Sequence, residues 1–288
     1  MQYEIVTDSS ANLTDAIIDR FGIHILSLVF RVRGEEYLSY EKGKKTEAKP
    51  FYERMRRGEV ITTGLINAHA CRELFEGLLK QGKDILYIGF SSALSGTFDV
   101  GMMTAKQLME EYPESKIIAV DSLAASLGEG LLVYYAAQLR EEGKSIEETH
   151  TWLKENIRHC CHWFTVGDLQ YLKRGGRISA TSAFLGNILH IKPVLHVDDE
   201  GRLVPVSKVM GRRESLIELV HRMKETCINP KDQIAAITHG DTIEDAEFVE
   251  GMVRELGVKD VLINYVDLVV GAHCGPGTIA LFFMGTKR

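Results

Sequence analysis

The 288-residue chain has little of what marks the more specialised protein classes. Its cysteines are few (5), odd in number and irregularly spaced, which argues against a disulfide scaffold and is typical of a reducing compartment. Lys and Arg (34) are outnumbered by Asp and Glu (40), which removes the electrostatic basis for nucleic-acid binding. No apolar run approaches the roughly 18 residues of a membrane span, and the first residues do not resemble a signal peptide. We therefore expect a cytoplasmic protein.

A metal centre is also not expected, although His159-Cys160-Cys161-His162 brings four metal-binding residues together in the sequence. Side chains that are adjacent in sequence point away from one another on a helix or a strand. Four consecutive residues therefore cannot converge on one ion unless they form a loop. We interpret the two cysteines as buried thiols near the end of a helix.

Apolar periodicity in the first part of the chain predicts alternating strands and helices. The predicted strands are 3–7, 24–32, 85–90 and 116–120, and the predicted helices are 16–21, 69–81, 100–111 and 128–142. The polar segment 33–58 is predicted to be a solvated flap. Strands that alternate with helices of this length predict a parallel sheet with helices on both faces.

The pattern changes after a predicted capping box at Ser145 and Glu148, which opens a helix to about residue 158. The elements predicted beyond it are a strand at 164–166, a Gly-rich break within 168–188, a hairpin of 192–197 and 202–209, helices 212–225 and 242–256, and strands 233–238, 261–269 and 278–284. We predict two α/β domains with a ligand between them. Residues 1–160 form a parallel-sheet αβα sandwich and residues 161–288 a smaller mixed-sheet α+β domain, into which an N-terminal segment can cross.

Two hydroxyl-rich turns are the most informative local feature. Thr62-Thr63-Gly64 is one, and Ser91-Ser92-Ala93-Leu94-Ser95-Gly96-Thr97 lies between a predicted strand and a predicted helix. Backbone N–H groups and hydroxyls at such a turn suit an anion, and ligands of parallel sheets bind at the carboxyl ends of the strands. Because neither turn contains Lys or Arg, they predict a carboxylate or another weakly charged head group held by neutral donors.

Familiar nucleotide motifs are incomplete in this chain. Gly143-Lys144-Ser145 resembles the end of a phosphate loop, but Gln138 replaces its first glycine. Gly128-Glu129-Gly130 is not a dinucleotide fingerprint, because Val133 replaces the third glycine. Binding of ATP or NAD by these routes is therefore not expected.

A serine hydrolase or acyltransferase is an alternative that the residue types leave open. Ser95 would be the nucleophile, His273 its base and Asp241 the group that orients the histidine. The turn lacks the glycines of a nucleophile elbow, which argues against this alternative.

Seven motifs, in order, closely resemble those of the DegV family, bacterial proteins that bind fatty acids. They are Val6-Thr7-Asp8-Ser9-Ser10, Thr62-Thr63, the turn 91–97, Asp121-Ser122, the segment 168–179 with Gly175-Gly176-Arg177, Lys192-Pro193, and Gly271-Ala272-His273-Cys274-Gly275-Pro276-Gly277-Thr278. The resemblance implies a two-domain protein of the EDD fold. It also implies that one long-chain, palmitate-like fatty acid is enclosed in an apolar tunnel as the ligand, without another cofactor.

The same resemblance implies roles for individual residues. Thr63 and Ser95 would bind the carboxylate, and Thr62, Ser92, Thr97 and His273 would support them. In some family members a separate ATP-dependent fatty acid kinase phosphorylates the bound carboxylate to an acyl phosphate, and the binding protein has no catalytic residue. Arg177 would contact that partner or the phosphate, while Met210 stands where family members often have arginine.

Overall fold

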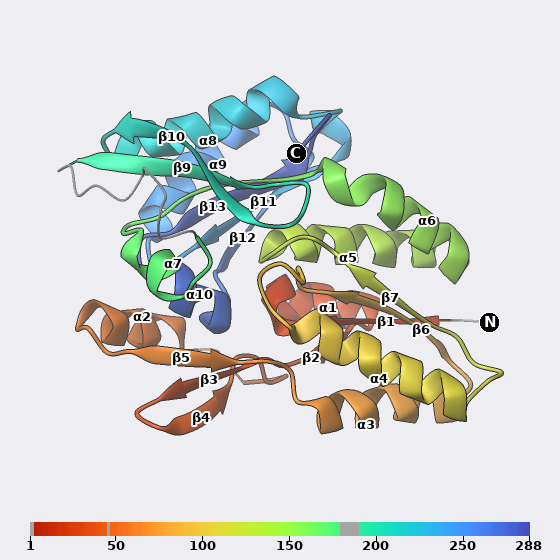
Figure 1. Cartoon of the computed structure of the whole chain (residues 1–288). Coiled ribbons are helices and arrows are strands. Elements are labelled where there is room, and N and C mark those ends of the chain that lie inside the picture. The colour runs from red at the N-terminus through yellow and green to blue at the C-terminus, as the bar shows by residue number, and fades with distance from the viewer. Residues whose placement is uncertain (1–2, 45–46, 179–189) are drawn as a thin grey trace.

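A computed structural model describes residues 3–44, 47–178 and 190–288 of the chain. Its first sheet, sheet A, is parallel and has the order β2-β1-β6-β7. The strands are β1 (Tyr3–Asp8), β2 (His24–Leu26), β6 (Asp84–Gly89) and β7 (Ile117–Asp121). Helices α3 (Ala68–Lys80) and α4 (Thr97–Glu111) cover one face, and α5 (Leu127–Glu141) and α6 (Ile146–Asn156) cover the other (Figure 1). Helix α1 (Asp15–Phe21) packs beside α5.

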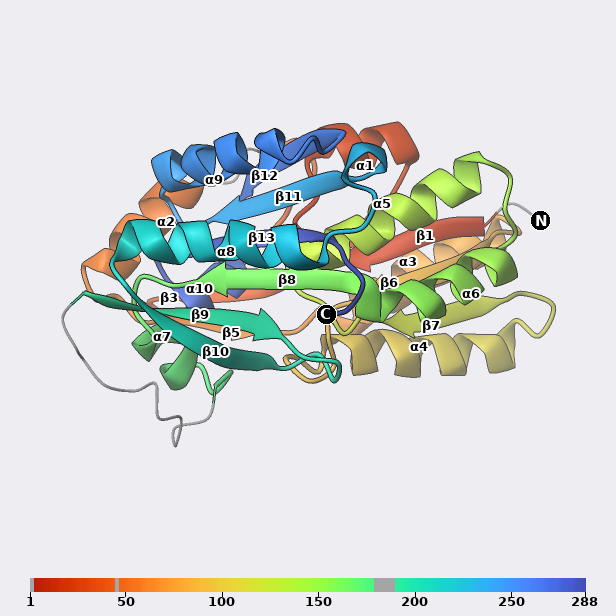
Figure 2. The ribbon, with the colours of Figure 1, turned by 90° about the horizontal axis from the view of Figure 1, so that it is seen from above.

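The second sheet, sheet C, is mixed and has the order β10-β9-β8-β13-β11-β12. Its strands are β8 (Cys160–Thr165), β9 (Ile191–Val197), β10 (Leu203–Met210), β11 (Ile234–His239), β12 (Asp260–Tyr265) and β13 (Ile279–Met284). Helices α8 (Arg212–Thr226) and α9 (Ile243–Glu255) cover its outer face (Figure 2). The short helices α7 (Gln170–Arg174) and α10 (Leu268–Cys274) lie at one end of the sheet. The predicted α/β class, a parallel sheet followed by a mixed sheet, is confirmed.

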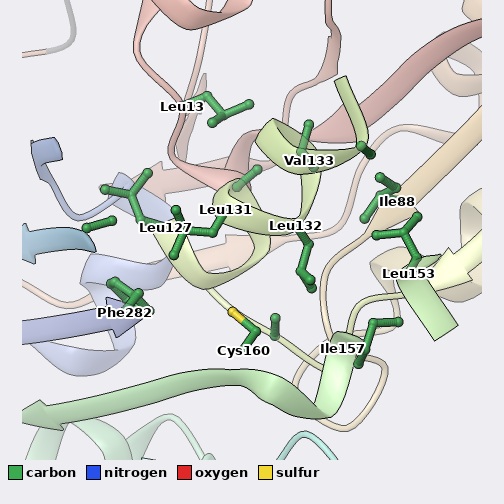
Figure 3. Packing of buried hydrophobic residues seen from close by; sticks show 14 of the residues in the cluster. Leu13, Ile88, Leu127, Leu131, Leu132, Val133, Leu153, Ile157, Cys160 and Phe282 are labelled. Carbon is green, nitrogen blue, oxygen red and sulfur yellow. The ribbon is translucent and has the colours of Figure 1, made fainter. Parts of the chain in front are cut away.

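Helix α5 packs against both sheets. It contacts β1 and β6 on one side and β8, β11 and β13 on the other. Figure 3 shows Leu131, Leu132 and Val133 leaving this helix in different directions, towards side chains of both halves of the molecule. A helix that is apolar all round is typical of a buried layer, and α5 is that layer here.

The prediction of one strand over residues 24–32 is wrong. The chain leaves sheet A after β2, and β3 (Val29–Val32) pairs antiparallel with β4 (Glu35–Leu38) and β5 (Ile61–Gly64) in a separate sheet B. The continuous apolar run concealed this break, because Ser27 and Leu28 form no ladder and direct the chain out of the first sheet.

The predicted solvated flap at 33–58 is more ordered than expected. It includes β4 and helix α2 (Ala48–Arg56), whose Phe51, Tyr52 and Met55 are buried. Surrounding charges hid this apolar face in the sequence. Helix α2 packs on α10, and the Tyr52 hydroxyl donates to the Val266 carbonyl at 3.3 Å. The N-terminal part of the chain therefore contributes to the surroundings of α10.

Other local predictions are confirmed or adjusted by the structure. The capping box at Ser145 and Glu148 forms, and the predicted hairpin is β9–β10. The predicted strand 261–269 ends at Tyr265, because Asp267 caps α10 instead. Residues 179–188 of the predicted Gly-rich break lie outside the described residues. The domain division near residue 160 stays a prediction.

Candidate functional site

A cavity lies between the two sheets and is the candidate ligand site. It contains about 980 Å³ of empty space, a figure that includes the solvent at its open mouth. Most of its lining is apolar, including Phe90, Leu94, Phe164, Val197, Leu203, Val266, Val269, Val270, Ala280 and Phe282. Leu65, which is 44 % exposed, marks the place where the cavity meets solvent.

Thr63, Ser95 and His273, which were predicted from the sequence as site residues, line this cavity. They come from sheet B, from the turn after β6 and from α10. Thr63 Oγ1 lies 2.8 Å from His273 Nε2. Ser95 Oγ donates to Thr97 Oγ1 at 3.0 Å and accepts from the Thr97 backbone N–H at 3.2 Å. These contacts put hydroxyls and an imidazole into a cavity whose lining is otherwise mainly apolar.

Strand geometry decides between the two neighbouring threonines. Successive side chains of a strand point to opposite faces. In β5, Thr62 pairs with Arg31 and is exposed, whereas Thr63 pairs with the buried Phe30 and lines the cavity. Thr63 is therefore the threonine that can contact a ligand there.

His273 is held as a neutral ring against a glycine. Burial first, and the nearby Arg177 charge second, lower the pKa of His273 to about 4. A Cβ at Gly175 would collide with His273 Nδ1, so only glycine lets the ring lie at this position. A neutral ring whose Nε2–H donates to Thr63 leaves the threonine hydroxyl proton free to point at a ligand.

Arg177 brings a positive charge to the same end of the cavity. The two hydroxyl-rich turns contain no Lys or Arg, so they alone did not predict this charge. Arg177 Nε donates to the Leu94 carbonyl at 3.2 Å and one terminal nitrogen to the Gly175 carbonyl at 2.5 Å. Within the described part of the chain no carboxylate forms an ion pair with it, and burial lowers its pKa. A bound anion would supply the missing negative charge.

The remaining predicted residues lie farther from the cavity or do not line it. Ser92 is exposed, and its backbone N–H donates to Asp121 Oδ1 at 3.2 Å. Thr97 is buried at the start of α4, where it is hydrogen-bonded to Ser95 and does not line the cavity. Asp241 binds Arg56 of α2 and not His273. Ser95 and His273 thus share the cavity, but the catalytic triad of the enzyme alternative is not assembled.

The polar groups deeper in the cavity are bonded to the protein itself. His162 Nδ1 contacts the Cys160 carbonyl at 2.9 Å, and its Nε2 accepts from the Ala125 N–H at 3.4 Å. Ser126 Oγ lies 3.1 Å from Asn12 Oδ1 and 3.2 Å from Thr238 Oγ1. Because these atoms already have partners, the interior offers mainly apolar contact to a ligand.

Sequence reasoning missed a buried carboxyl cluster beside the cavity. Asp8 and Glu129 are fully buried and share the Ser10 hydroxyl, which lies 2.5 Å from Asp8 Oδ1 and 2.8 Å from Glu129 Oε2. A hydroxyl has one proton, so it cannot donate to both carboxylates. Burial, and then the Asp8 charge, hold the pKa of Glu129 well above its usual range, and we take Glu129 as the protonated partner. The near-motif Gly128-Glu129-Gly130 gave no signal of this role.

Residues 160–162 of the cysteine and histidine run at 159–162 lie on β8, so successive side chains point to opposite faces of the sheet. Cys160 Sγ faces the Gly128 carbonyl, while Cys161 Sγ faces the Lys287 carbonyl on the other side of the sheet. Among residues 3–44, 47–178 and 190–288, no group of three or more His, Cys, Asp or Glu side chains is placed to hold a metal ion. In the same ranges no helix has both the length and the apolar character needed to cross a membrane.

Comparisons with known proteins agree over the whole chain. The family model described as "Uncharacterised protein, DegV family" matches residues 2–286. A DegV domain-containing protein of Clostridium perfringens is 44% identical over 288 residues, which are 100% of this chain and 99% of the relative.

Two solved structures show the same fold. One, described as showing fatty acid binding of a DegV family protein from Thermus thermophilus, has a TM-score of 0.88 and 27% identity, covering 99% of this chain and 100% of the other. DegV of Bacillus subtilis, described as a fatty acid binding protein, has a TM-score of 0.84 and 27% identity, with coverage of 99% and 100%.

Proposed function

The chain belongs to the DegV family, and from this premise we propose that it binds one long-chain fatty acid in the cavity between its sheets. The carboxylate contacts Thr63 and Ser95, and the acyl tail lies among the apolar side chains. The observation that carries the proposal is the division of the cavity, with hydroxyls, His273 and Arg177 at one end and apolar lining beyond. The fatty acids bound by the Thermus and Bacillus relatives support it.

The expected energetics match this division. A tail of about 14–16 methylenes, at roughly 0.8 kcal/mol each, contributes on the order of 11–13 kcal/mol before ordering costs. Hydrogen bonds to a carboxylate contribute about 1.5–3 kcal/mol each. The tail therefore supplies most of the affinity, and the head contacts determine where the carboxylate lies.

We further propose that the protein acts without a catalytic residue of its own, in the cytoplasm, and presents the carboxylate to a separate ATP-dependent kinase that forms the acyl phosphate. Neutral hydroxyl donors leave a carboxylate oxygen able to attack a phosphoryl group. Arg177 lies where it can contact the new phosphate or the partner. Met210 is 66 % exposed on β10, so it offers a partner an apolar contact in place of a charged one.

The test is extraction of the ligand. Protein purified and then denatured should release a long-chain fatty acid that mass spectrometry detects. Thr63→Ala and Ser95→Ala should each weaken palmitate binding by about 10- to 150-fold, because each removes one hydrogen bond to the carboxylate. Ser92→Ala is the matched control, since this neighbouring hydroxyl is exposed outside the cavity. Protein that carries no lipid and does not take up added palmitate would refute the proposal.

The hydrolase alternative predicts a different outcome. His273 contacts Thr63, and Ser95 donates to Thr97, so the serine has no base in position. We expect that a fluorophosphonate probe leaves Ser95 unlabelled while the protein still binds fatty acid. Labelling that is lost in Ser95→Ala would instead identify an enzyme.

A further inference from the structure

We infer that Arg288 is a positioning residue for the acyl chain: its guanidinium fastens the β9–β10 turn to the loops of the first sheet and so holds the far wall of the cavity. The inference rests on the proposed function for its ligand. It concerns the end of the cavity opposite Thr63 and His273.

The Arg288 guanidinium is enclosed by four backbone carbonyls from three separate segments. It donates to Leu123 at 2.7 Å, Ile157 at 2.8 Å, Cys160 at 3.0 Å and Asp198 at 3.0 Å. Burial lowers the pKa of Arg288, although arginine stays charged in proteins. A planar fork of five donors can satisfy such a set of acceptors, whereas a lysine ammonium has three donors and a different geometry.

Two of these carbonyls come from segments that follow strands of different sheets. Leu123 lies in the loop between β7 and α5, and Asp198 begins the β9–β10 turn. The turn also touches the first sheet directly. Ser91 Oγ donates to the Gly201 carbonyl at 2.9 Å, and a Cβ at Gly201 would lie 3.0 Å from Leu123 Cα. Gly201 also has a φ of +78°, so glycine suits both the backbone and the close approach.

The docked turn forms part of the cavity wall. Val197 and Leu203 flank the turn, pair with each other and line the cavity. Figure 2 shows the turn beside the start of β8, whereas α7 and α10 lie towards the opposite end of that strand. An acyl chain whose carboxylate is at Thr63 therefore approaches Val197 and Leu203 with its distal part.

The β9–β10 turn is also connected to the carboxylate end of the cavity, but only indirectly, through Ser91. The Ser95 backbone N–H donates to the Ser91 carbonyl at 3.1 Å, and Ser91 holds Gly201. Releasing the turn by removing Arg288 leaves this Ser91 contact in place. We therefore expect the distal wall to loosen first and the carboxylate contacts to persist.

The proposal is tested by the dependence of affinity on chain length. In Arg288→Gln we expect palmitate to bind at least tenfold more weakly and to dissociate faster, while decanoate, which fills only the part nearest the carboxylate, changes less than twofold. Arg288→Lys should lie between this variant and the unsubstituted protein. Arg140→Gln is the control, because Arg140 is a largely buried arginine that donates to the Tyr3 and Phe21 carbonyls away from the cavity.

A second measurement does not need a ligand. Amide hydrogen exchange in Arg288→Gln should speed up at residues 198–203, with Arg140→Gln unchanged there. Equal losses for palmitate and decanoate, or unchanged exchange in the turn, would overturn the inference and reduce Arg288 to general stability. If the unsubstituted protein binds neither acid, the proposed function fails, and the exchange result alone decides whether Arg288 holds the turn.

Discussion

Ala280→Trp is expected to abolish the binding of long-chain fatty acids while the protein still folds. Ala280 lies on β13, lines the cavity and is buried. An indole at this position occupies space that the acyl tail needs. If it displaces about six methylenes at roughly 0.8 kcal/mol each, the loss is about 5 kcal/mol, or a several-thousand-fold weaker affinity. Displacement of a fluorescent fatty acid measures the affinity, and thermal unfolding reports whether the fold persists.

Two further variants make this result specific to the cavity. Ala280→Val adds less volume and should weaken palmitate binding more than decanoate binding. Ala236→Val adds the same volume on β11, opposite Phe282 and outside the cavity lining, and should cost stability but not affinity. Wild-type affinity in a folded Ala280→Trp protein would show that the acyl chain does not lie in this cavity.

Raising the pH is expected to destabilise the protein through Glu129. The folded protein holds a proton on Glu129, because burial and Asp8 raise the pKa of this carboxyl well above its usual range. The unfolded chain has already lost that proton above about pH 4.5. Since the folded state binds more protons, the free energy of unfolding falls as the pH rises, by about 1.4 kcal/mol for each pH unit below the folded pKa.

Other buried groups titrate mainly at lower pH. Burial raises the pKa of Asp8 and of Asp267 to about 6, so their contributions also fall as the pH rises, but mostly below about pH 6.5. The histidines act with the opposite sign. The pKa of His273 is lowered to about 4 and that of His162 well below its usual range, so stability is lost there as the pH falls below about 6.5. Comparison with a variant that lacks the Glu129 carboxyl therefore separates its contribution from those of the other groups.

Glu129→Gln is the matched test, because glutamine mimics the protonated acid and keeps partners for Thr7 and Ser10. Chemical denaturation at successively higher pH should show a free energy of unfolding that falls in the original protein and falls much less in the variant. Parallel pH dependence of the two proteins would mean that Glu129 is ionised in the folded state.

The sequence predicted the alternating elements of sheet A well, because their hydrophobic periodicity is strong and their helices are long. It failed at Val29–Val32, where an apolar run continued through a change of sheet. Helix α2 was missed because Phe51, Tyr52 and Met55 are interrupted by charged residues. What covers α2 is α10, about 220 residues later in the chain, and no local pattern can indicate such a contact.

The candidate site was predictable only in part. The hydroxyl-rich turns indicated an anion site, and the family resemblance implied Thr63 and Ser95, which the structure brings to one cavity. In the sequence, Gly175 is part of a Gly-rich break and of a family motif. The structure explains why this residue is glycine, because a Cβ here would collide with the ring of His273. The Asp8–Glu129 pair and the carbonyls around Arg288 join residues that are at least 90 positions apart. Such pairings depend on the tertiary fold, so no local sequence pattern indicates them.

The head end of the cavity is built from three independently formed pieces. Thr63 comes from sheet B, Ser95 from the first sheet and His273 from the short helix beside the second. A carboxylate that contacts all three acts as a molecular crosslink between them. The dissociation rate of the lipid then depends on how the three pieces are placed relative to one another. A substitution that displaces any one of them, even a substitution remote from the cavity, changes how long the lipid stays bound.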